Sequence, residues 1–117
     1  MNGERPLAVV FFRTETGAEP VREWLRSLEK AERRAIGEDI LTVQYAWPLG
    51  RPLVGYLGSQ IWEVRSRLKN RIARTLFILD EQEIVLLHGF MKKDRKTPKG
   101  DLALAQKRRA QYLQHHA

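Results

Sequence analysis

The stretch from Ile61 to Lys93 constrains the fold of this chain most, because it predicts three consecutive β-strands. The predicted strands cover residues 61–65, 71–79 and 83–93. Their links are so short that neighbouring strands must run antiparallel. The second and third strands carry apolar residues at both parities, which is typical of strands buried on both faces. We therefore expect an antiparallel sheet with this three-stranded meander at its centre.

Apolar patterning before the meander predicts one further strand and two helices. Residues 7–12 form an apolar run rich in β-branched and aromatic side chains, and they predict a strand. A helix is expected to begin at Pro20, because proline fits the first helical position. A second helix is expected over residues 31–46. The apolar stripes of the two helices are Val21, Trp24, Leu25 and Leu28, and then Ile36, Ile40 and Val43. These stripes predict a helical hairpin that packs on the sheet.

Two further stretches complete the predicted organisation. Residues 48–59 contain two prolines and three glycines and predict a connecting loop. Thr97 and Pro98 predict the N-cap and the first position of a last helix, which runs to about residue 113. The fold class expected for residues 1–117 is one α+β domain. Its antiparallel four-stranded sheet is packed by the N-terminal helical hairpin and followed by a C-terminal helix.

Basic residues are concentrated in the second half of the chain, whose net charge is +7. Residues 1–60 hold 8 basic and 8 acidic residues, whereas residues 61–117 hold 13 and 6. The strand directions bring seven cations to one end of the sheet: Arg65, Arg67, Lys69, Arg71, Arg74, Lys92 and Lys93. The acidic residues Asp80, Glu81 and Glu83 lie at the opposite end. This separation predicts an anion-binding site, whose partner is nucleic acid or an acidic protein segment.

The composition also limits the classes of site and location that are expected. The chain has no cysteine, which excludes disulfides and thiolate metal sites. His88 stands alone and the other two histidines lie near the C-terminus, so neither a metal nor a cofactor is expected. No apolar run approaches the roughly 20 residues of a membrane span, and no signal-peptide pattern precedes Val9. We therefore expect a soluble cytoplasmic protein that does not bind a membrane.

Several fragments taken together resemble a known family. They are Ile61-Trp62-Glu63-Val64-Arg65, Arg74-Thr75-Leu76-Phe77, Leu86-Leu87-His88-Gly89-Phe90-Met91-Lys92-Lys93, and Thr97-Pro98 before an Ala-rich helix. The chain resembles the RelE/ParE toxin superfamily from about residue 7 to residue 112, and is most similar to its phage-derived, HigB-type branch.

This resemblance implies the toxin of a type II toxin–antitoxin system, RelE-like in fold, with a helix-turn-helix, HigA-like antitoxin as partner. It also implies a ribosome-dependent mRNA endoribonuclease, or mRNA interferase, that inhibits translation by cutting mRNA on the ribosome. The ParE branch of the superfamily instead inhibits DNA gyrase without enzymatic activity. An inactive basic RNA-binding domain is a third interpretation of the sequence.

The basic residues can supply the chemistry of metal-independent RNA cleavage. In that reaction the 2′-hydroxyl attacks the adjacent phosphate, which requires a base, an acid and charge stabilisation. Arg65 and Arg74 stay charged and are predicted to stabilise the phosphate. Lys92 and Lys93 are predicted to carry the proton transfers, because neighbouring cations lower the pKa of a lysine. The alternative, in which both lysines only bind phosphate, stays open. Glu63 is expected to orient arginine as a salt-bridge partner.

Four further residues are predicted to contact RNA: Arg67, Lys69, Arg71 and Phe90. The three basic residues lie in or beside the turn between the first two strands of the meander, and are expected to bind the RNA backbone. Phe90 has the same parity as Lys92 and is expected either to stack on an RNA base or to pack in the core. His88 is expected to be structural, and Tyr112 is expected to pack against the body of the protein.

Overall fold

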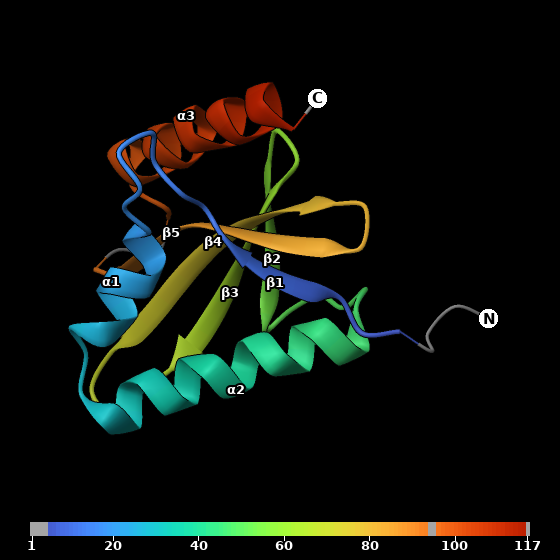
Figure 1. Cartoon of the computed structure of the whole chain (residues 1–117). Coiled ribbons are helices and arrows are strands. Elements are labelled where there is room, and N and C mark those ends of the chain that lie inside the picture. Colours follow the sequence, from blue (N-terminus) through green and yellow to red (C-terminus); the bar gives the residue numbers. More distant parts are fainter. Residues whose placement is uncertain (1–4, 94–95, 117) are drawn as a thin grey trace.

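The computed structural model describes residues 5–93 and 96–116, with five strands and three helices. The strands are β1 (Ala8–Phe11), β2 (Val54–Gly58), β3 (Ile61–Arg67), β4 (Ile72–Asp80) and β5 (Glu83–Met91). The helices are α1 (Pro20–Arg26), α2 (Lys30–Ala46) and α3 (Lys99–His115). Figure 1 shows α2 and α3 on opposite sides of a twisted sheet, with α1 beside the end of that sheet.

The sheet has the strand order β1-β5-β4-β3-β2. The predicted meander is confirmed, because β3, β4 and β5 pair as consecutive antiparallel neighbours. The prediction of a four-stranded antiparallel sheet is wrong in two respects. The sheet has a fifth strand, β2, and β1 pairs with β5 in parallel. The apolar run of β1 predicts a strand, but it does not show which strand β1 pairs with or in which direction. Its partner, β5, lies more than 70 residues later in the sequence.

The fifth strand, β2, lies within the stretch predicted as a loop. It is an edge strand, where glycine is better tolerated than in the middle of a sheet. A tight turn with positive φ at Gly58, Ser59 and Gln60 joins β2 to β3. Val54 anchors the strand in the core, with 2% of its surface exposed. The high proline and glycine content of this stretch therefore reflects its turns and its edge position.

The first core lies between the sheet and the helical hairpin, as predicted. Val21 of α1 and Ile36, Ile40 and Val43 of α2 are buried there. Gly89 of β5 lies directly beneath Trp24 of α1, because a Cβ atom built on Gly89 would overlap the indole ring. The absence of a side chain at residue 89 thus allows α1 to approach the sheet.

The second core lies between the other face of the sheet and α3. Ala105 and Tyr112 of α3 are buried against Leu76, Ile78 and Leu87. The packing expected for Tyr112 is therefore confirmed. Since β4 and β5 contribute to both cores, their apolar residues at both parities are explained. In the part of the chain that the structure describes, no helix has the length and apolar character needed to cross a membrane.

Candidate functional site

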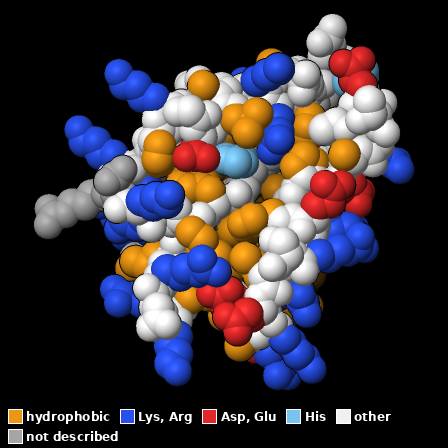
Figure 2. Space-filling model, turned by 90° about the vertical axis from the view of Figure 1, so that its left-hand side faces the viewer, with side chains coloured by type: hydrophobic (Ala, Val, Ile, Leu, Met, Phe, Trp, Pro, Cys, Tyr) orange, Lys and Arg blue, Asp and Glu red, His pale blue; other side chains and the backbone are white. Residues whose placement is uncertain are grey.

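The register of the meander brings most of the predicted cations to one end of the sheet. Arg65 of β3 lies opposite Arg74 of β4, and Arg74 lies opposite Phe90 of β5. The backbone N–H of Lys92 donates a 2.7 Å hydrogen bond to the carbonyl of Ile72, which extends the pairing beyond β5. Asp80 and Glu83 pair at the opposite end. Figure 2, which views the molecule from the side where α1 lies, shows lysine and arginine side chains projecting around the margin of that face.

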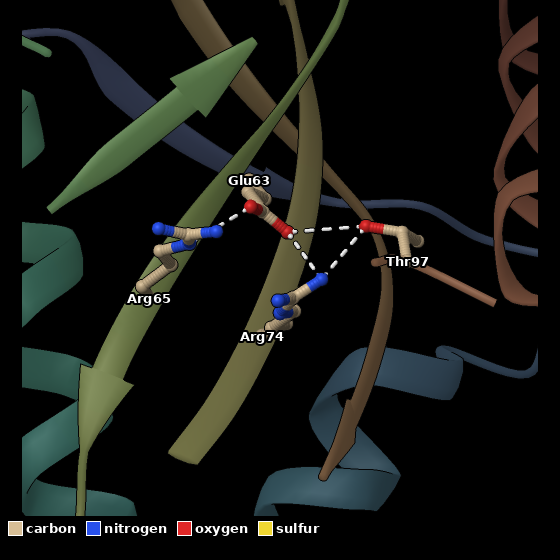
Figure 3. Close-up of polar contacts among 4 residues, drawn as sticks. All are labelled: Glu63, Arg65, Arg74 and Thr97. Atoms are coloured by element: carbon tan, nitrogen blue, oxygen red, sulfur yellow. Dashed lines mark hydrogen bonds and ion pairs between the residues drawn. The ribbon is translucent and has the colours of Figure 1, made fainter. Parts of the chain in front are cut away.

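A buried carboxylate connects the two arginines that were predicted to bind phosphate. Glu63 is only 2% exposed, and its Oε2 accepts a 3.0 Å hydrogen bond from Nε of Arg65. Its Oε1 lies 3.4 Å from Nη1 of Arg74. Thr97 joins the same group, because its Oγ1 accepts a 2.9 Å hydrogen bond from Arg74 Nη1 and lies 3.4 Å from Glu63 Oε1. Figure 3 shows Arg65 and Thr97 on opposite sides of the Glu63 carboxylate. The expected role of Glu63 in orienting arginine is therefore confirmed.

Burial distinguishes Arg65 from Arg74. The side chain of Arg65 is 31% exposed, whereas that of Arg74 is 1% exposed. Arg65 can therefore contact a ligand while Glu63 holds it in place. Arg74 lies inside the protein, where a charged group is stable only when it is paired and hydrogen-bonded. The strand register places Arg74 at the predicted site, but in this structure it supports the site from within.

Two adjoining depressions form the accessible part of the site, which we call the basic groove. The first has a volume of about 410 Å³ and is lined by Ala35, Glu38, Asp39, Pro52, Leu53, Arg65, Arg67, Ile72 and Lys92. The second has a volume of about 400 Å³ and is lined by Arg67, Leu68, Asn70, Arg71, Ile72, Lys92 and Lys93. Three residues, Arg67, Ile72 and Lys92, line both depressions, so the two lie side by side across the strand ends. The groove brings together five of the seven predicted cations.

The predicted basic residues at the turn have different environments. Arg67 and Lys69 are exposed, and Lys69 lines neither depression. Arg71 is held by Glu32 of α2 through two hydrogen bonds of 2.9 Å from Nε and Nη2. The hydrogen bond from Arg71 lowers the pKa of Glu32, and the same bond raises the pKa of Arg71. Arg71 therefore also attaches the turn to α2.

Phe90 and His88 lie on the face of the sheet that α3 covers. Phe90 is half-buried against the second core, and its ring stacks on that of His88 at 5.4 Å with an interplanar angle of 22°. Nε2 of His88 lies 2.6 Å from Oδ1 of Asp101, in the first turn of α3. This contact attaches α3 to the sheet, which agrees with the structural role expected for His88. The packing alternative for Phe90 is confirmed, and its stacking on an RNA base stays a prediction.

Three residues of the site were not predicted from the sequence. Glu38 and Asp39 line the groove from α2, and their only sequence signal is a position beside the apolar stripe of that helix. Thr97 was predicted to cap α3, but Pro98 occupies the N-cap position, and among the described residues no side chain makes a capping hydrogen bond to this helix. The hydroxyl of Thr97 instead bonds to Arg74 and Glu63, which lie far away in the sequence.

The described residues contain no group of three or more histidine, aspartate or glutamate side chains placed to hold a metal ion. Comparison with known families finds one that matches residues 23–110, namely the phage-derived Gp49-like proteins (DUF891). The matched region runs from α1 into α3 and includes the whole basic groove. The comparison with curated proteins found no match.

Proposed function

Because this chain belongs to the Gp49-like family of phage-derived proteins, a RelE/HigB-like toxin family, we propose that it is the toxin of a type II toxin–antitoxin system. We propose further that it belongs to the HigB-type branch and cleaves mRNA on the ribosome in the cytoplasm. Cleavage proceeds without metal, by attack of the 2′-hydroxyl on the adjacent phosphate. A HigA-like, helix-turn-helix antitoxin keeps the enzyme inactive.

The basic groove at the strand ends is the observation that supports this proposal best. Arg65, Arg67, Arg71, Lys92 and Lys93 line it, and a polyphosphate strand needs such an array of cations. An inhibitor that acts by binding another protein has less need of a phosphate-binding groove. The groove therefore favours an RNA substrate over DNA gyrase as the target.

Each side chain has a distinct role in the proposed reaction. Arg65 is partly exposed and fixed by Glu63, so it stabilises the negative charge that develops on the phosphate. Lys92 and Lys93 supply proton transfer or further charge stabilisation. Arg67 and Lys69 bind the RNA backbone, and Phe90 stacks on a base at the margin of the site. Arg74 acts indirectly, because it holds Glu63 in place.

Expression of the protein in bacteria, with mapping of new RNA 5′ ends, tests the proposal. We expect growth arrest and new 5′ ends within translated codons. Arg65→Ala should abolish both effects, whereas Arg5→Ala, which removes an exposed arginine outside the groove, should leave them unchanged. DNA breaks and an SOS response without new 5′ ends would favour a gyrase inhibitor. No growth effect would favour a binding domain without activity.

A further inference from the structure

We infer that Asp39 of α2 is a catalytic residue, the base that accepts the proton of the attacking 2′-hydroxyl. This inference rests on the proposed endoribonuclease function, and it gives the role of the base to a carboxylate instead of to a lysine. Asp39 lines the first depression of the groove together with Arg65, Arg67 and Lys92.

The position of Asp39 follows from the packing of α2. Ile36, Ile40 and Val43 are buried against the sheet and fix the rotation of the helix. Asp39 lies three residues after Ile36 and four before Val43, so it flanks the buried stripe. It is half-buried and lines the groove, whose other wall is formed by the ends of β3 and β4 and by Lys92.

Asp39 differs from the neighbouring carboxylates in its bonding. Glu63 is held by two arginines and Glu32 by Arg71. Glu38 lies 4.0 Å from Arg34 on the exposed side of α2. Within residues 5–93 and 96–116, Asp39 makes no salt bridge and no side-chain hydrogen bond. A half-buried carboxylate without such a partner can accept a proton without disrupting the fold.

One wall of the groove supplies the base of the proposed reaction, and the other wall supplies the acid. A carboxylate accepts a proton and an ammonium group donates one, so Asp39 and Lys92 together provide the base and the acid. The 2′-hydroxyl proton passes to Asp39 while the 2′-oxygen forms a bond to phosphorus. The bond from phosphorus to the 5′-oxygen breaks, and Lys92 protonates that oxygen. The products are a 2′,3′-cyclic phosphate and a 5′-hydroxyl end, and water then restores both side chains.

The acidic residues do not prevent RNA from binding in the groove. The first depression contains Arg65, Arg67 and Lys92 against Glu38 and Asp39, and the adjoining depression adds Arg71 and Lys93. The groove therefore keeps a net positive charge. The carboxylates lie on the α2 side alone, so a phosphate can bind the cations of the strand ends while its 2′-hydroxyl faces Asp39.

Cleavage of mRNA on programmed ribosomes by the purified protein tests the assignment. Asp39→Asn should lower kcat by at least about 100-fold, with the affinity for a single-stranded RNA oligonucleotide unchanged or higher. Asp39→Glu should recover part of the activity. Glu81→Gln removes one negative charge at the opposite end of the sheet, and should leave kcat unchanged.

The outcomes separate this assignment from the proposed function. Full activity of a folded Asp39→Asn protein would overturn the role of Asp39 and leave the endoribonuclease function standing. An equal loss in Asp39→Asn and Glu38→Gln would show a general effect of charge, and would also overturn it. No cleavage by the unchanged protein would overturn the proposed function, and the assignment of Asp39 with it. Thermal denaturation checks folding, and Asp39→Ser provides a second variant without a carboxylate.

Discussion

Gly55 of β2 lies opposite Glu63 of β3, and a Cβ atom on Gly55 would be 3.2 Å from Glu63 Oε2. The absence of a side chain at residue 55 therefore leaves the space that the buried carboxylate occupies. In that space Glu63 contacts both Arg65 and Arg74. An edge strand thus determines how the arginines of the groove are arranged.

Substitution of Gly55 should destabilise the protein and weaken the site. Gly55→Val should lower the free energy of unfolding by about 1–3 kcal/mol, because extra atoms must displace Glu63. It should also reduce RNA affinity, because Arg65 loses its fixed orientation. Urea denaturation and RNA binding measure the two effects. Gly50→Ala is the control, since a Cβ at this exposed position meets no atom within 4 Å. Equal effects of the two substitutions would contradict the role of Gly55.

Removal of the Glu63 side chain should destabilise the protein far more than removal of an exposed acidic side chain. Glu63→Ala removes the buried carboxylate that contacts both Arg65 and Arg74, and should lower the free energy of unfolding by about 3–5 kcal/mol. Glu38→Ala removes an exposed partner of Arg34, and should change it by less than about 1 kcal/mol. Chemical denaturation of both variants tests this. A loss below 1 kcal/mol for Glu63→Ala would show that the buried pair is not required for stability.

The contact between Gly89 and Trp24 predicts a strong coupling between these two positions. Gly89→Ala introduces an overlap with the indole ring, and should lower the free energy of unfolding by about 1–3 kcal/mol. Gly89→Ala should lower the free energy of unfolding by a smaller amount in a Trp24→Leu background, because the smaller leucine side chain leaves space for the added Cβ atom. A double-mutant cycle measures this coupling. Additive effects of the two substitutions would mean that the loss arises elsewhere.

The sequence predicts local elements and the central meander well, because both depend on short-range patterns. Pro20 begins α1, and the apolar stripe of α2 faces the sheet as expected. The parallel pairing of β1 with β5 was not predicted, because it is a contact between distant segments. The strand β2 was not predicted either, because its glycines resemble those of a loop.

The location of the candidate site was predicted from the sequence. Which of its residues are buried, and which residues α2 contributes to it, were not predicted. Arg65 and Arg74 lie opposite each other on neighbouring strands. This proximity can be predicted, because side chains alternate between the two faces along each strand. The burial of Arg74 could not be predicted, because it involves contacts with Glu63 on the neighbouring strand and with Thr97, which is distant in the sequence. Asp39 was not predicted, because a carboxylate on a helix gives no signal until the helix is placed beside the strand ends.

The salt dependence of RNA binding should report the contacts of the turn. For single-stranded RNA, the logarithm of the affinity falls with the logarithm of salt concentration by about 0.7 per phosphate neutralised. Arg67→Ala should therefore reduce this slope by about 0.7. Arg5→Ala should leave the slope unchanged. Titration of an oligonucleotide at several salt concentrations measures the slope, and a slope near zero in the unchanged protein would exclude phosphate binding by the groove.

Tyr112 should make stability depend on pH in the alkaline range. Burial, aided by Glu83 and Asp80, raises the pKa of Tyr112 to about 12. The folded state therefore holds the phenolic proton more tightly than the unfolded state, in which a tyrosine has a pKa of about 10. This stabilisation is complete below about pH 10 and is lost as the pH rises towards 12. Alkaline denaturation of Tyr112→Phe should lack this component, whereas Tyr45→Phe, at an exposed tyrosine, should retain it.

The pairing of β1 with β5 also affects when the protein can fold during its synthesis. The first strand to leave the ribosome lies beside the last, so β1 has no partner until β5 has emerged. Lys92 emerges later still, and α3 must follow before the second core closes. A nascent chain whose translation stops before β5 therefore has neither a complete sheet nor an assembled groove. The strand order thus delays any activity of the groove until β5 and Lys92 have been synthesised.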